Sequence, residues 1–185
     1  MIVEKIRNHC ENKNLIRITR TVGKEALKIS NGYIIDYSDD FVLLQETGDF
    51  LVLCYNILPI NQITKIRFNK WDKYYTKIMM LEGEAEKVGI KYKIDLNNWQ
   101  SIFKSIKNHL LNVIVECENP DINGFTIGPV IKTTKKLVYM QDFDPCGFLD
   151  EKPTSIDFES ITRVKFDDRY INVFSKYLRQ RKPKK

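Results

Sequence analysis

The sequence predicts a mainly β protein with helices (α+β), built as two small barrels in tandem, each preceded by an N-terminal helix. Three observations lead to this prediction: an internal repeat, an amphipathic helical pattern at the start of each half, and a series of short strand patterns after it. A helix followed by about five short antiparallel strands in roughly 80 residues is too small for a sandwich and suits a small closed or nearly closed barrel.

The internal repeat is visible when residues 32–45 are set above residues 128–141, because the apolar positions of the two segments coincide without a gap. Residues 63–68 match residues 161–166, and the matching blocks follow one another in the same order in both halves. A repeat of this kind sets the fold, since each copy is one structural unit. The predicted parts are a first unit at 1–80, a linker helix and strand at 81–96, a second unit at 97–178, and a basic tail at 179–185 that we expect to be disordered.

The first unit begins with Ile2, Ile6 and Cys10 at helical spacing, which predicts one apolar stripe on a helix. Short segments rich in β-branched and aromatic residues follow, and the turn-forming trio at 38–40 separates two of them. A second turn is expected at 46–50. In chain order, the predicted strands are 15–19, 33–37, 41–45, 57–60 and 63–68.

The second unit begins with a helix whose N-cap is predicted at Asp95 or Asn97. Its apolar residues recur at three- and four-residue spacing: Trp99, Ile102, Phe103, Ile106 and Leu110. Turns are expected at 133–136 and at 142–147, where Pro and Gly occupy turn positions. Strand patterns lie between and after these turns, among them 113–117, 155–158 and 161–166.

Net charge and cysteine spacing exclude several classes of protein. The formal charge is +6, but five cations lie in the last seven residues, so the folded body keeps only +1 after these five are subtracted. The four cysteines are far apart and form no C-x-x-C pair, which predicts no zinc site. No apolar segment approaches the ~18 residues that span a bilayer. We therefore expect a cytoplasmic protein with reduced thiols, without a cofactor and without a membrane partner.

The helix-plus-five-strands order resembles the Sm-like (LSm) family, whose fold is a strongly bent SH3-like barrel found in RNA-binding proteins. The spacing of the family's first motif is followed from Gly32 to Leu43 and again from Gly128 to Tyr139. The resemblance would place its RNA-contacting Asp and Asn at Ser38 and Val42, and at the matching positions of the second unit, Thr134 and Val138. Valine offers no hydrogen-bond donor to a base edge, so the resemblance implies the barrel fold rather than the family's RNA pocket. The two-unit layout is similar to that of uncharacterised bacterial proteins.

Two classes of function follow from these observations. The first is a non-enzymatic interaction protein that binds an unknown protein partner, or a second copy of itself, through sheet edges. The alternative is a protein that binds RNA or another single-stranded nucleic acid, because aromatic and cationic side chains intermingle near Trp71 and Tyr170. The same mixture also suits a final strand or helix that packs on its barrel. The candidate nucleic-acid-binding residues are Arg67, Lys70, Trp71, Lys165, Arg169, Tyr170, Arg179, Arg181, Lys182, Lys184 and Lys185.

Enzymatic activity has no support in the sequence. His9 and His109 occupy matching helix-end positions, without a carboxylate at a motif spacing. The acidic pairs, such as Asp39-Asp40, suit turns, and their spacing is not that of a calcium loop. Phosphate loops, nucleophile elbows and zinc-protease motifs are absent, so no catalytic residue is predicted.

Overall fold

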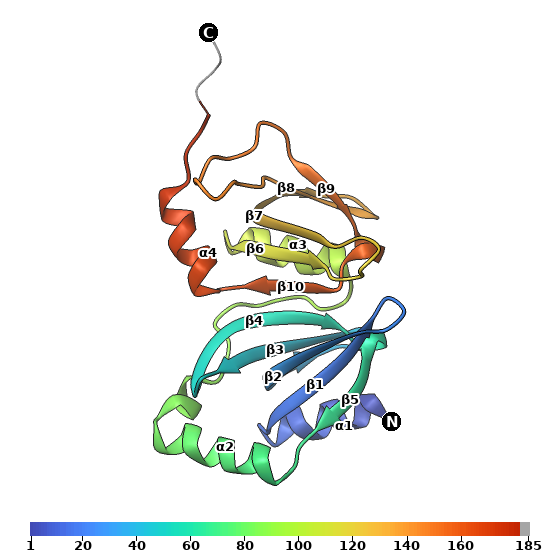
Figure 1. The fold of residues 1–185 in the computed structure, drawn as a ribbon, viewed down its shortest axis with the longest axis vertical. Helices are drawn as coiled ribbons and strands as arrows, with labels where there is room; N and C mark the ends of the chain where they lie inside the picture. The colour runs from blue at the N-terminus through green and yellow to red at the C-terminus, as the bar shows by residue number, and fades with distance from the viewer. Residues whose placement is uncertain (182–185) are drawn as a thin grey trace.

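A computed structural model describes residues 1–181, in which ten strands form one continuous sheet with four α-helices packed around it (Figure 1). The α-helices are α1 (Ile2–Glu11), α2 (Lys70–Leu81), α3 (Trp99–Asn108) and α4 (Arg169–Phe174). The strands are β1 (Leu15–Val22), β2 (Ala26–Tyr37), β3 (Phe41–Gly48), β4 (Leu51–Pro59), β5 (Ile63–Arg67), β6 (Asn112–Cys117), β7 (Gly124–Thr133), β8 (Leu137–Met140), β9 (Thr154–Asp157) and β10 (Arg163–Phe166). Short 3₁₀ helices are η1 (Ile60–Gln62), η2 (Glu84–Lys87), η3 (Phe158–Ser160) and η4 (Ser175–Tyr177).

The chain is mostly β with some helices, but the prediction of two closed barrels is wrong. The strand order is β5-β1-β2-β3-β4-β10-β6-β7-β8-β9, with antiparallel neighbours throughout and with β5 and β9 at its two open ends. Figure 1 shows β10 lying against β4, so that the second half continues the sheet of the first. A barrel must pair the two edge strands of its own sheet, which in the first half are β5 and β4. Here the outer edge of β4 is paired with a strand of the other half, and the sheet stays open.

The repeat seen in the sequence recurs as an order of elements. Each half contains a helix, four strands, a 3₁₀ turn, a fifth strand next to the first, and a further helix. The strand pairs β2–β3 and β7–β8 shift register between Ile34 and Asp36 and between Val130 and Lys132. These positions match one another in the sequence alignment of the two halves, so the repeat also preserves the place where the second strand bends.

The linker and the start of the second helix differ from the expectation. No strand forms between Val88 and Asn98; instead, Ile94 and Leu96 are buried in the core that contains α3. The N-cap of α3 is Asn98, whose side-chain oxygen accepts a hydrogen bond from the backbone N–H of Ser101, rather than Asp95 or Asn97. Asp95 instead accepts from the N–H of Asn97, which explains why both residues resemble caps in the sequence.

The largest hydrophobic core crosses the boundary between the halves. Leu43 and Ile57 from β3 and β4 belong to the same buried cluster as Phe103 from α3 and Val164 from β10. A second cluster lies between α1 and the first half of the sheet, and it includes the fully buried Ile6. Separate barrels would each need a core of their own, whereas this chain buries its central strands in a shared one.

The repeated segment begins with glycine in both halves, at Gly32 and Gly128, for a steric reason. A Cβ atom on Gly32 would lie 2.1 Å from the carbonyl oxygen of Gln45, and a Cβ on Gly128 would lie 2.1 Å from that of Gln141. The first and last residues of the repeated segment therefore lie against each other in both halves. Only glycine permits this approach, since backbone cannot move aside as a flexible side chain can.

Replacing Gly32 with Ala is expected to destabilise the fold by about 1–3 kcal/mol, because the new methyl group would push β2 away from β3. Urea unfolding of both proteins measures the change. Gly48→Ala is the matched control, since its Cβ meets only the tip of the Leu53 side chain at 3.1 Å. Equal stabilities of Gly32→Ala and Gly48→Ala would contradict this explanation.

Candidate functional site

A buried arginine connects the two halves of the sheet. Arg20 on β1 is fully buried, and its Nη2 donates to Oε2 of Glu118 at 2.8 Å. Its Nη1 donates to the backbone oxygen of Thr162 at 2.9 Å and to Oε1 of Gln62 at 3.2 Å. Glu118 and Thr162 belong to the second half, so this charge is neutralised only when both halves are in place.

The carboxylate of Glu118 interacts with several other side chains besides Arg20. Its Oε2 also accepts a hydrogen bond from the hydroxyl of Thr162 at 2.9 Å, and Arg163 and Lys28 lie 4.0 and 3.9 Å from its Oε1. Burial acts to raise the pKa of Glu118, but the charge and hydrogen bond of Arg20, with Arg163 and Thr162, outweigh it and leave the pKa below its usual value. The site is therefore a structural ion pair with a carboxylate that stays charged at neutral pH.

A second polar contact crosses the β4–β10 pairing. Glu46 on β3 accepts from the side-chain amide of Asn56 at 2.9 Å and lies 3.6 Å from Nζ of Lys165 on β10. Burial tends to raise the pKa of Glu46, but Asn56 and Lys165 outweigh it and lower the pKa. Burial also raises the pKa of the neighbouring Cys54 thiol, so this cysteine is not an activated nucleophile.

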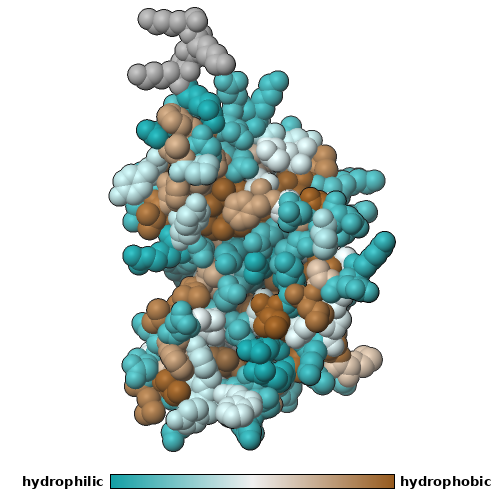
Figure 2. All heavy atoms as spheres, in the orientation of Figure 1, coloured by the Kyte–Doolittle hydropathy of each residue, from teal (hydrophilic) through white to brown (hydrophobic). Residues whose placement is uncertain are grey.

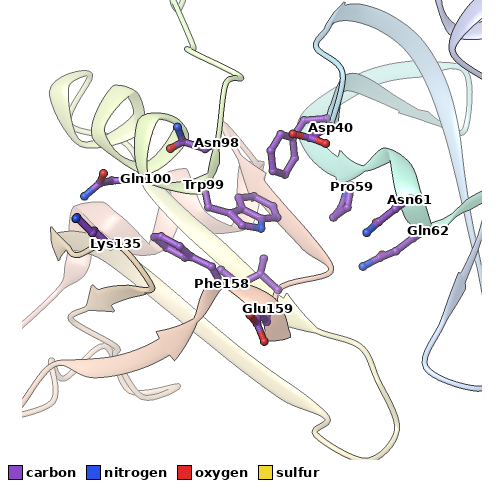
Figure 3. Close-up of a pocket in the computed structure, with 12 residues that line it drawn as sticks. Asp40, Pro59, Asn61, Gln62, Asn98, Trp99, Gln100, Lys135, Phe158 and Glu159 are labelled. Carbon is purple, nitrogen blue, oxygen red and sulfur yellow. The ribbon is translucent and has the colours of Figure 1, made fainter.

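A pocket of about 540 Å³ lies at one end of this junction, and residues from both halves line it. Figure 3 shows the indole of Trp99 in the middle of the pocket, with Phe158 on one side and the amides of Asn61 and Gln62 extending from the other. Trp99 packs edge-on against Phe41, with 4.6 Å between the ring centroids. Within residues 1–181, none of the residues predicted to bind nucleic acid lines this pocket.

The first group of predicted residues comes together at the start of α2. Arg67 donates to both carboxylate oxygens of the buried Asp72, at 2.7 and 3.0 Å, which neutralises its charge. Trp71 remains 65 % exposed, and Nζ of Lys70 lies 4.9 Å from its ring centroid. Arg67, Trp71 and Asp72 line a second pocket, of about 420 Å³, between α2 and the sheet. Arg67 thus holds the helix in position, and Trp71 is the group left available.

The second group is not an open site. Lys165 is half-buried and lies between the carboxylates of Glu46 and Asp168, at 3.6 and 4.0 Å. Tyr170 packs on Phe174, with 4.8 Å between the ring centroids, although half of its surface stays exposed. Arg169 is exposed at the first position of α4. Residues at matching sequence positions therefore make different contacts in the two halves.

Two residues of the predicted basic tail contact the body of the second half. Arg179 donates to the backbone oxygen of Cys146, and its guanidinium lies 4.1 Å from the ring of Phe148. Arg181 pairs with Asp144 at 2.9 Å. The remaining predicted residues of the tail, Lys182, Lys184 and Lys185, lie outside the described residues.

The positions suggested by the Sm-like resemblance do not form a base-binding pocket. Val42 and Val138 are fully buried in the cores. Ser38 donates to the backbone oxygen of Leu96 and accepts from the N–H groups of Asp40 and Phe41, so it closes the turn between β2 and β3. These residues have structural roles.

The two end strands of the sheet are open to pairing. The backbone of β5 bonds to β1 and that of β9 bonds to β8, and within residues 1–181 neither strand makes a backbone hydrogen bond on its other side. The two edges differ in charge. Strand β5 carries Lys65 and Arg67, whereas β9 carries Asp157.

Further features bear on enzymatic function and on membranes. Among the described residues, no group of three or more His, Cys, Asp or Glu side chains could hold a metal ion. The part of the chain from Met1 to Arg181 also has no helix that is long and apolar enough to cross a membrane.

Comparison with known protein families, curated proteins and solved structures finds no match. The resemblance to the Sm-like family therefore stays an expectation from the sequence.

Arg20 and Glu118 stabilise the fold, but no pattern in the sequence identifies them. They lie 98 positions apart, and each sits in an ordinary strand-like or turn segment. A lone arginine between two threonines in a predicted strand would usually face solvent. Only the packing of β1 beside the second half shows that this one is buried.

We expect Glu118→Gln to lower the free energy of unfolding by about 3–5 kcal/mol at pH 7, because Arg20 would keep a buried charge without its partner. Urea unfolding measures this loss. Glu4→Gln removes the pairing of the exposed Glu4 with the chain's amino group, and this control should change stability by less than about 1 kcal/mol. A similar small change for both variants would contradict the assignment of Arg20 and Glu118 as the main polar contact between the halves.

The same pair predicts how stability depends on pH. Because the folded-state pKa of Glu118 lies below its unfolded value, its contribution is complete above the unfolded pKa of about 4.3 and is lost as pH falls through the folded pKa. The stability difference between Glu118→Gln and the parent should therefore be full at pH 7 and shrink below about pH 4. Urea unfolding at a series of pH values tests this, and a difference that does not change with pH would exclude it.

Proposed function

We propose that this chain is a non-enzymatic interaction protein that binds by pairing of sheet edges, with a second copy of itself as the partner. The observation that carries the proposal is the β4–β10 junction inside the chain. There the fourth strand of one half pairs with the fifth strand of the other. The open strands β9 and β5 are the fourth strand of the second half and the fifth strand of the first. Each open strand is thus the counterpart, in the other half, of a strand that already takes part in the β4–β10 pairing.

The internal junction also suggests the register of such a contact. Within the chain, Ile57 pairs with Val164 and Asn56 pairs with Lys165. By the sequence repeat and the matching 3₁₀ turns, the pair Ile57–Val164 corresponds to Ser155–Ile66. In the same way, the pair Asn56–Lys165 corresponds to Thr154–Arg67. A β9 strand would then lie antiparallel to the β5 strand of a second copy, with Thr154 beside Arg67 of that copy.

Charge favours a head-to-tail contact over pairing of identical edges. Two β5 strands would bring the Lys65 side chains of both copies together, whereas β9 carries Asp157 and no cation. A head-to-tail contact is heterologous and leaves one edge of each kind open, so it leads to a closed ring or a longer chain of copies. The proposal includes the cytoplasmic location expected from the sequence, and all four cysteines are free thiols, as a reducing compartment would keep them.

A second candidate function is binding of single-stranded nucleic acid. The specific observation in its favour is that the exposed Trp71, with Nζ of Lys70 4.9 Å from its ring centroid, lines a pocket that also contains Arg17 and Arg67. An exposed aromatic ring next to cations is a stacking platform for a base. The pocket lies between α2 and one face of the sheet, and one of its lining residues, Arg67, belongs to the edge strand β5.

Edge pairing predicts opposite effects of two substitutions at one position. Thr154→Lys places a cation diagonally across from Lys65 of the second copy and should weaken self-association about two- to fivefold, whereas Thr154→Glu should strengthen it by a similar factor. Light scattering after size-exclusion chromatography, over a range of protein concentrations, measures the association. Asn108→Lys and Asn108→Glu make the same charge changes on the exposed end of α3 and serve as matched controls.

A protein that remains monomeric at every concentration would overturn the second copy as partner. A dimer that responds equally to the substitutions at Thr154 and at Asn108 would overturn the edge strand as its interface. Monomeric behaviour together with a co-purified protein whose binding responds to Thr154→Lys alone would keep edge pairing and replace the second copy by a different protein.

A further inference from the structure

One face of the first half of the sheet is only partly covered by α2. Arg17 on β1 lies opposite Asn31 on β2 and opposite Arg67 on β5, and opposed residues of antiparallel strands project to the same face. Towards one end of this face, α2 packs Met79 against Leu15 and Tyr33. Towards the other end, the exposed Ile29 and Lys65 lie opposite Thr19 with no helix over them. In Figure 2, hydrophobic and strongly hydrophilic side chains lie next to each other over this part of the molecule.

The pocket of about 420 Å³ lies at the border between α2 and this uncovered face. Trp71 and Tyr75 form its helix side, and Arg17, Asn31 and Thr47 form its strand side. Tyr75 is fixed by stacking on Phe50, with 4.4 Å between the centroids, and its hydroxyl accepts a hydrogen bond from the N–H of Phe50 at 2.7 Å. The pocket thus has one aromatic wall and one polar wall.

Trp71 is held in place although most of its indole is exposed. The side-chain oxygen of Asn69 accepts hydrogen bonds from the N–H groups of Trp71 and Asp72, and the Asp72 carboxylate accepts in return from the N–H of Asn69. Arg67 fixes the same carboxylate through two hydrogen bonds. The backbone of the first turn of α2 is therefore fixed, and it holds the exposed indole beside the pocket as a flat surface for a planar ligand.

The polar wall has donors that the chain leaves unused. Nε of Arg17 donates to Oδ1 of Asn31 at 2.9 Å, which orients the guanidinium. No acceptor among residues 1–181 takes a hydrogen bond from Nη1 or Nη2 of Arg17, or from the side-chain nitrogen of Asn31. Because Arg67 is neutralised by Asp72, Arg17 is the cation available to a ligand. The carboxylate of Asp49 lines the turn side of the pocket, so an anionic group would bind on the Arg17 side.

A buried hydroxyl gives independent support for a ligand. Thr47 is 6 % exposed, lines the pocket, and its Oγ1 has no hydrogen-bond partner in the described structure. Buried polar groups are nearly always hydrogen-bonded, since leaving one unpaired costs free energy. Because Oγ1 is itself buried, a ligand supplies the missing partner when the Thr47 side chain turns toward the pocket.

We propose that this pocket binds one nucleotide of a single-stranded nucleic acid, with the base stacked on Trp71, the base edge at Thr47 and Asn31, and a phosphate at Arg17. This inference rests on the second candidate function and names its binding residues. A nucleotide has the three properties the pocket requires: a planar aromatic face, an edge of hydrogen-bonding groups, and an anionic group. A single strand is favoured over a free nucleotide because the uncovered face with Lys65 continues from the pocket and could carry the next phosphates.

Fluorescence anisotropy with labelled single-stranded RNA and DNA, at low and at near-physiological salt, tests the proposal, with AMP and UMP as unlabelled competitors. Trp71→Ala is expected to weaken binding about 5- to 150-fold, as the loss of one stacked base does, while Trp71→Phe should retain most of the affinity. Arg17→Gln should weaken binding and reduce its dependence on salt. The matched controls are Tyr177→Ala, at an exposed aromatic residue of the second half, and Arg7→Gln, at an exposed residue of α1; both should bind like the parent.

Thr47→Val separates a ligand contact from a structural role. Valine has nearly the same shape and removes a hydroxyl that has no partner, so the variant should be at least as stable as the parent in urea but should bind the oligonucleotide several-fold more weakly. Unchanged affinity would remove Thr47 from the site.

The other outcomes are distinguishable. Oligonucleotide binding that is insensitive to Trp71→Ala and Arg17→Gln would overturn this pocket as the site and leave nucleic-acid binding standing. If AMP or UMP competes as strongly as unlabelled oligonucleotide at the same concentration of nucleotide units, the ligand of the pocket is a free nucleotide and not a single strand. No binding of any probe at low salt would overturn both the pocket and the second candidate function.

Discussion

The antiparallel pairing of β4 with β10 is the contact on which the rest of the structure depends. It joins the two halves into one sheet and places Ile57 and Val164 in a common core. It also brings the buried guanidinium of Arg20 to Glu118, and a buried charge is tolerated only with such a partner. The pairing, the shared core and the ion pair therefore form together, and separating the halves would expose all three.

This junction also determines where binding can occur. Since β4 and β10 occupy each other's edges, β5 and β9 are the strands left open in the part of the chain from Met1 to Arg181, and they lie at opposite ends of the sheet. The helices that follow the two fifth strands have diverged. In the first half, α2 has 12 residues and forms one wall of the pocket at Trp71, whereas α4 has 6 residues and packs Tyr170 on Phe174. The repeat thus provides two similar frameworks, of which the first carries the pocket at Trp71.

Neighbouring residues of the candidate site could be predicted from the sequence, and distant ones could not. Arg67, Lys70 and Trp71 are close in the chain, and their mixture of charge and aromaticity was sufficient to mark them. Arg17, Asn31 and Thr47 come from three different strands, and only the strand register brings them to one pocket. Lys165 shows the opposite case: its sequence matches Arg67, but the junction places it against Glu46, where it neutralises a half-buried carboxylate.

The sequence by itself determined the helix that opens each half and the turns between its strands, because these depend on apolar periodicity and on turn-forming residues. It did not determine that the two halves share an open sheet. A strand edge presents the same N–H and C=O groups to any partner, so local pattern cannot distinguish closure of one half on itself from pairing with the other. Tertiary structure decided this, through the buried contacts that only the β4–β10 pairing provides: the shared core and the neutralisation of Arg20 by Glu118.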